Sequence, residues 1–102
     1  MLPLFQLSTR SYDDEIILVK NAMIQLEKKC DVKDGFSLSK PLTKLGWSTF
    51  NLQITAEMET IIEKSGMMEG ALGHKIGEQL KNFLGHFLES HGSQVRIKEI
   101  PY

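Results

Sequence analysis

Four side chains in the sequence are of the types that bind transition metals or act as nucleophiles: His74, His86, His91 and Cys30. Two metal ligands on one helix face are usually four residues apart, and no pair of these histidines has that spacing. Cys30 is distant from all three histidines and completes an apolar helical stripe, which is typical of a small buried side chain. We therefore predict no metal, no cofactor and no catalytic residues.

The segment Gly70–Gly77, with the sequence GALGHKIG, contains glycines at a density found in phosphate-binding loops. It lacks the Gly-Lys-Ser/Thr ending of a P-loop, and it does not follow a predicted strand as a dinucleotide-binding turn would. The acidic run from Asp13 to Glu15 begins two residues after Ser11, an N-cap candidate, so we interpret it as a cluster at a helix N-terminus. Neither pattern predicts an active site.

Basic residues are concentrated in one part of the chain. Residues 20–54 contain six lysines and three acidic residues, whereas residues 55–92 contain three lysines and six acidic residues. Lysines combined with an aromatic ring can hold a phosphate backbone and stack a base. The candidate nucleic-acid patch comprises Lys28, Lys29, Lys33, Lys40, Lys44 and Trp47. The alternative is that Trp47 covers an edge of the core and that the lysines are simply solvated.

Length and composition are those of an ordinary soluble domain. The chain has 102 residues, a net charge of -1, 41% hydrophobic residues and 25% charged residues, which predicts one domain over residues 1–102. This charge predicts no general attraction to nucleic acid or to an anionic membrane. The lone cysteine favours a reducing compartment, so we expect a cytoplasmic protein. The N-terminal segment has neither the basic leader of a signal peptide nor the length of a membrane span.

Hydrophobic periodicity predicts the elements that position these residues. Alternation indicates strands near residues 4–9, 36–38, 48–54 and 95–98. Steps of three and four residues indicate helices over residues 12–30 and 56–65, with Thr55 as an N-cap. A third helix is expected from about Met67 to His91.

This order is the βαββαβ pattern of an α+β, ferredoxin-like sandwich, in which helices cover one face of an antiparallel sheet. The last helical region is either long or broken. An alternative α+β arrangement, in which a short hairpin packs against a helical bundle, is also consistent with the pattern.

Glycines recur at helical spacing at the start of the third predicted helix, at positions 66, 70, 73 and 77. Each glycine inside a helix costs about 0.8–1 kcal/mol relative to alanine, so close packing against another backbone would have to compensate. The alternative is that residues 65–73 form a flexible loop and that the helix begins near Leu72 or His74.

A helix over residues 67–91 would be about 37 Å long, whereas a seven-residue strand spans only about 23 Å. Because such a helix outruns its sheet, its apolar face needs cover from elsewhere, and we predict a two-fold homodimer. The predicted self-association surface comprises Gly70, Gly73, Gly77, Leu80, Leu84 and Phe87.

These patterns favour a small non-enzymatic interaction or regulatory protein that self-associates and binds a protein partner, for example as an inhibitor or adaptor. The alternative is a small nucleic-acid-binding module that uses the lysine and tryptophan patch. A third hypothesis, a small enzyme, would need a cleft between subunits that contains His74, His86 or Cys30 together with a buried carboxylate.

Overall fold

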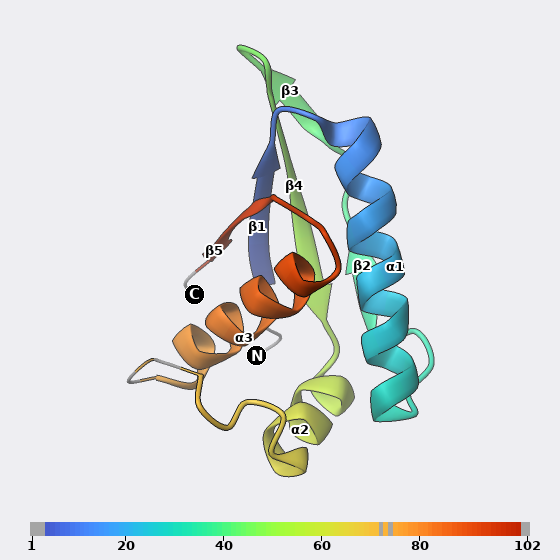
Figure 1. Ribbon diagram of the computed structural model, residues 1–102, viewed down its shortest axis with the longest axis vertical. Helices are drawn as coiled ribbons and strands as arrows, with labels where there is room; N and C mark the ends of the chain where they lie inside the picture. Colours follow the sequence, from blue (N-terminus) through green and yellow to red (C-terminus); the bar gives the residue numbers. More distant parts are fainter. Residues whose placement is uncertain (1–3, 72, 74, 101–102) are drawn as a thin grey trace.

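The computed structural model describes residues 4–71, 73 and 75–100, which form an α+β fold with one open antiparallel sheet (Figure 1). The elements in chain order are β1 (Leu4–Thr9), α1 (Tyr12–Cys30), β2 (Phe36–Leu38), β3 (Leu42–Lys44), β4 (Trp47–Ile54), α2 (Ala56–Ser65), α3 (Ile76–Ser90) and β5 (Arg96–Glu99). The predicted α+β class is therefore confirmed.

The sheet is built around β1 and β4, which pair over the full length of β1. Its strand order is β2-β4-β1-β5, and every pair is antiparallel. The short strand β3 also pairs with β4, opposite Trp47, Ser48 and Thr49. Pro41 lies between β2 and β3, at a position where a residue without an N–H group would interrupt a continuous edge strand. The sequence pattern did not predict β3.

Alternation along the two central strands separates the faces of the sheet. In β4 the residues at even positions, from Ser48 to Ile54, are buried, and in β1 Phe5, Leu7 and Thr9 are buried. The buried apolar side chains of both strands form a single core with residues from all three helices, so the helices cover one face of the sheet (Figure 1). Trp47 is out of phase with the buried set, as its position in the sequence predicts.

The helices α1 and α2 agree with the prediction. In α1 the apolar stripe is buried from Val19 to Cys30. Thr55 caps α2, because its Oγ1 accepts a hydrogen bond of 3.2 Å from the backbone N–H of Met58. Ser11 precedes α1 but makes no side-chain capping bond; its backbone N–H donates instead to Thr9 Oγ1 at 3.0 Å.

The expected helix over residues 67–91 is wrong, because Gly66 ends α2 and Gly70 and Gly73 lie in a non-helical connection, so that only Gly77 of the four glycines lies in the next helix. Gly66, Gly70 and Gly73 have φ values of 82°, 89° and 142°, in the region that favours glycine and is incompatible with a right-handed helix. Consequently α2 ends at Ser65 and α3 begins at Ile76. The alternative of a non-helical segment over residues 65–73 is the one that the described residues match.

This shorter helix fits the sheet. The 15 residues of α3 span about 22 Å, close to the length of β4. Leu80, Leu84 and Leu88 are at most 1% exposed within the single chain. The leucines of the apolar face that was expected to need cover from a second chain are therefore covered by this chain itself, whereas Phe83 and Phe87 are partly buried and Ile76 is exposed.

Candidate binding surface on the open face of the sheet

The face of the sheet opposite the helices is polar and basic. Residues paired across an antiparallel sheet point to the same side, so the register identifies the members of this face. Those in the central strands and β5 are Leu4, Gln6, Ser8, Trp47, Thr49, Asn51, Gln53, Arg96 and Lys98, and those in the edge strands are Ser37, Leu42 and Lys44. Arg10 directly follows β1, and its guanidinium group lies over the Trp47 ring on this side of the sheet. We call this set the open face.

Trp47 is the centre of a cationic cluster on the open face. The guanidinium carbon Cζ of Arg10 lies 5.0 Å from the centroid of the Trp47 ring, and that of Arg96 lies 4.9 Å from it. These distances are within the range of cation–π attraction. Lys44 is the direct cross-strand partner of Trp47. One indole ring thus lies among three basic residues from three separate parts of the chain.

Charge on the open face has one sign. Arg10, Lys44, Arg96 and Lys98 are basic, and none of the described strand residues that point to this side is acidic. The only carboxylate in a described strand, Glu99, pairs with the buried Phe5 and so lies on the helix side. Because the whole chain has a net charge of -1, this surface is polarised relative to the rest of the molecule.

Side-chain amides occupy the middle of the open face. Gln6 lies directly opposite Asn51, and Gln53 is two residues further along β4. An amide side chain offers both donors and an acceptor, which is the combination that base edges require. The surface therefore combines cations and a ring at one end with hydrogen-bonding groups beside them.

The structure divides the patch of lysines that the sequence suggested. Lys44 and Trp47 lie together on the open face, whereas Lys28 and Lys29 lie in the last turn of α1, on the helix side. The ammonium nitrogen of Lys29 lies 5.7 Å from the ring centroid of Phe87. Lys33 follows α1, and Lys40 is exposed between β2 and β3.

Three basic members of the open face were missing from that predicted patch: Arg10, Arg96 and Lys98. Arg10 is separated from Arg96 and Lys98 by more than 80 residues of chain, and only the pairing of β1 with both β4 and β5 brings them together. The alternation of Arg96 and Lys98 with apolar residues did indicate that they face away from the core. The sequence pattern did not show which strands lie beside them.

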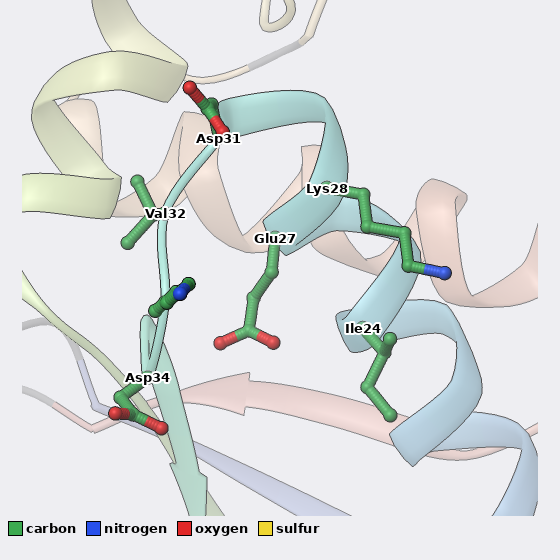
Figure 2. A pocket seen from close by; sticks show the side chains of 7 residues that line it. Ile24, Glu27, Lys28, Asp31, Val32 and Asp34 are labelled. Atoms are coloured by element: carbon green, nitrogen blue, oxygen red, sulfur yellow. The ribbon is translucent and has the colours of Figure 1, made fainter.

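A hollow of about 440 Å³ lies between the last turns of α1 and the segment that leads to β2. Figure 2 shows the side chains that line it. It includes two of the predicted lysines, Lys28 and Lys33, but also three carboxylates, those of Glu27, Asp31 and Asp34. In Figure 2 Lys28 points away from the hollow and Glu27 points into it. A carboxylate oxygen of Glu27 accepts a 2.7 Å hydrogen bond from the N–H of Gly35, so this side chain holds the turn in place. The hollow is not suited to an anion.

The residues predicted for self-association do not form one surface. Leu80 and Leu84 are in the core, and Gly70 and Gly73 lie in the segment between α2 and α3. A Cβ atom on Gly77 would come within 3.0 Å of the Glu99 carboxylate, so this glycine serves a contact inside the chain. Phe87 is partly buried; its ring packs against that of Phe83, at 6.0 Å between centroids, and that of His91, at 4.5 Å.

The candidate metal ligands and nucleophile are scattered. His86 is exposed, His91 follows the last residue of α3 with its Nδ1 2.9 Å from the carbonyl oxygen of Phe87, and His74 lies outside the described residues. Burial raises the pKa of the Cys30 thiol. Among residues 4–71, 73 and 75–100, no group of three or more His, Cys, Asp or Glu side chains is arranged to hold a metal ion.

Comparisons with known proteins found no match. No protein-family model matches the sequence, and neither a curated protein nor a solved structure matches it significantly. Within the described part of the chain, no helix has both the length and the apolar character needed to cross a bilayer.

Proposed function

We propose that this protein is a non-enzymatic binding module and that the open face of its sheet binds single-stranded nucleic acid. One observation carries the proposal: Trp47 lies within about 5 Å of two guanidinium groups on a surface whose described strand residues include no carboxylate. This is the nucleic-acid function that the sequence suggested as an alternative, with a different set of cations.

The chemistry of such a ligand matches the groups present. Nucleobases stack on aromatic rings and on guanidinium planes, while phosphates are attracted to arginine and lysine. A sheet surface suits unpaired bases, because neighbouring strands about 4.8 Å apart present side chains from several positions to a flat ligand. The amides of Gln6 and Asn51 would then contact base edges that a duplex would conceal.

The proposed architecture is ferredoxin-like, with β3 added at one edge. The order β2-β4-β1-β5, the antiparallel pairing and the placement of a helix after β1 and helices after β4 support this interpretation. A free cysteine also supports the expected cytoplasmic location, because thiols persist in a reducing compartment.

Binding to a protein partner, the function favoured by the sequence patterns, remains a second proposal. The observation in its favour is the exposed edge of β5, which is considered below. The proposed homodimer no longer has the support of a helix that outruns its sheet.

A titration of the single tryptophan tests nucleic-acid binding directly. We expect single-stranded oligonucleotides to change Trp47 fluorescence and to bind less tightly as salt is added, because bound phosphates release counterions. Two double variants should be compared. One carries Arg96→Gln and Lys98→Gln on the open face, and the other carries Lys28→Gln and Lys29→Gln on α1. Each double substitution removes two positive charges.

The open-face pair should weaken binding by about tenfold and reduce its salt dependence, whereas the α1 pair should have a much smaller effect. Equal weakening by both pairs would show that binding depends only on overall charge. The proposal would be contradicted if Trp47 fluorescence stayed unchanged at low salt when oligonucleotide was added to a millimolar concentration of its phosphate groups.

A further inference from the structure

Strand β5 is the last strand on its side of the sheet. Its backbone pairs with β1, and the structure describes no strand beyond it. The N–H of Ile100 donates to the carbonyl of Leu4 at 2.9 Å, which identifies that pair as a hydrogen-bonded pair. Because such pairs recur every two residues, Arg96 and Lys98 direct their backbone groups toward β1, whereas Ile97 and Glu99 direct theirs outward.

A hollow lies beside this edge on the helix side. It has a volume of about 250 Å³; Val95 and Ile97 supply its apolar wall, and Lys81, Asn82, Gly85, His86 and Glu89 of α3 line the rest. Gly85 leaves space at this junction, because a Cβ atom there would already approach Ile97 Cγ2 to 3.3 Å. A side chain on a strand paired with Ile97 would point to the same side as Ile97 and toward this hollow.

We propose that the edge of β5 binds an extended peptide segment in which acidic residues alternate with apolar ones. The backbone of the segment would pair with Ile97 and Glu99, and its apolar side chains would lie on the helix side beside Ile97. Its acidic side chains would lie on the other side, next to Arg96 and Lys98, where opposite charges across a strand pair are favourable. Charge complementarity thus selects the partner.

The same charges disfavour a second copy of this chain at the edge. Two copies related by a two-fold axis would pair their β5 strands antiparallel. The registers centred on Arg96, Ile97, Lys98 or Glu99 place Arg96 opposite Arg96, Arg96 opposite Lys98, Lys98 opposite Lys98 and Glu99 opposite Glu99, respectively. Each register opposes like charges, which is destabilising.

This inference does not depend on nucleic-acid binding, because it uses the outward backbone of an edge strand and not the Trp47 ring. The test uses the full chain and a synthetic seven-residue peptide of alternating glutamate and valine with blocked termini. We expect binding at or below millimolar peptide. Bound peptide should slow hydrogen exchange at the backbone amides of Ile97 and Glu99 at least tenfold, as measured by NMR.

Two modified peptides separate strand pairing from charge attraction. N-methylation of the valines removes donors that strand pairing needs and should weaken binding at least tenfold, whereas a lysine–valine peptide should bind more weakly than the glutamate–valine peptide. Equal binding of the N-methylated and unmodified peptides would overturn the proposal. Failure of the glutamate–valine peptide to bind would also overturn it.

The substitution Lys98→Glu tests the charge requirement in the protein. It should weaken binding of the glutamate–valine peptide roughly two- to fivefold and strengthen binding of the lysine–valine peptide by a similar factor. Lys28→Glu is the matched control, since it makes the same charge change on α1, away from the edge. Equal effects of the two substitutions, or a dimer formed by pairing of β5 strands, would contradict the choice of partner.

Discussion

The two faces of the sheet carry different kinds of side chains. On the helix side Phe5, Leu7, Phe50, Leu52 and Ile54 are at most 2% exposed and pack with the helices. On the open face the alternate positions of β1 and β4 hold Leu4, Trp47, amides and hydroxyls, and the strands beside them add basic side chains. A tryptophan on a solvent-facing sheet position does not contribute to that core. The comparison indicates that the covered face specifies the fold and that the open face is available for a ligand.

The largest difference between the faces should appear in stability. Phe50→Ala removes a ring that is 2% exposed and that meets the Tyr12 ring edge-on, at 5.3 Å between centroids. We expect a loss of about 3–5 kcal/mol in the free energy of unfolding. The neighbouring substitution Thr49→Ala, on the open face, should cost about 0.5–1 kcal/mol or less. Urea denaturation of both variants measures the difference.

Similar losses from the two substitutions would mean that the open face is also part of the stabilising core. In that case the polar face would require a structural explanation, and its assignment as a binding surface would lose its basis. A loss confined to Phe50→Ala would show that the helix side stabilises the fold and that the open face contributes little to its stability.

The sequence predicted which face of the sheet each strand residue occupies better than it predicted which strands lie side by side. Period-two alternation correctly assigned Phe50 and Trp47 to opposite sides, because side-chain direction in a strand is a local property. The grouping of Arg10 with Arg96 could not be predicted in this way, because it depends on which strands pair. Helical spacing of the glycines was misleading: Gly66 and Gly70 adopt positive φ values, and the spacing of residues does not reveal φ.

A buried carboxylate in α1 accepts hydrogen bonds from the segment that leads to β5. Glu15 in α1 is 8% exposed, and its Oε2 accepts hydrogen bonds from Ser93 Oγ at 2.7 Å and from the backbone N–H of Gln94 at 2.9 Å. These two residues come just before Arg96, so the carboxylate on the helix side fixes the start of the strand that carries this open-face cation.

Glu15→Ala should therefore lower the free energy of unfolding by about 1–3 kcal/mol, because two donors lose a buried acceptor. Asp14→Ala, one residue away and exposed, is the matched control and should have a smaller effect. Thermal or urea unfolding gives both values. If Glu15 also positions β5, the NMR shifts of Arg96 and Trp47 should change in Glu15→Ala and stay constant in Asp14→Ala. Constant shifts in both variants would show that the contact contributes to stability alone.

The smallest expected effect concerns two neighbouring carboxylates on α2, Glu59 and Glu63. Burial raises the pKa of Glu59 above its ordinary value of 4.5, and the hydrogen bond to Glu63 and the repulsion between these carboxylates raise it further. The two residues are four apart on α2, where like charges are neighbours. Protonation of Glu59 is therefore easier in the folded chain than in the unfolded chain.

The raised pKa of Glu59 in the folded state determines the direction in which stability changes with pH. The stabilisation from protonating Glu59 is fully present below pH 4.5 and is lost as the pH rises through the higher pKa of the folded state. Glu59→Gln should consequently raise stability at pH 7 by about 0.2–0.5 kcal/mol, with little gain at low pH. Urea unfolding at several pH values measures this. Glu57→Gln is the control, because it removes one negative charge from the same helix without changing the Glu59–Glu63 pair. An equal gain from both substitutions would assign the effect to net charge and not to this pair.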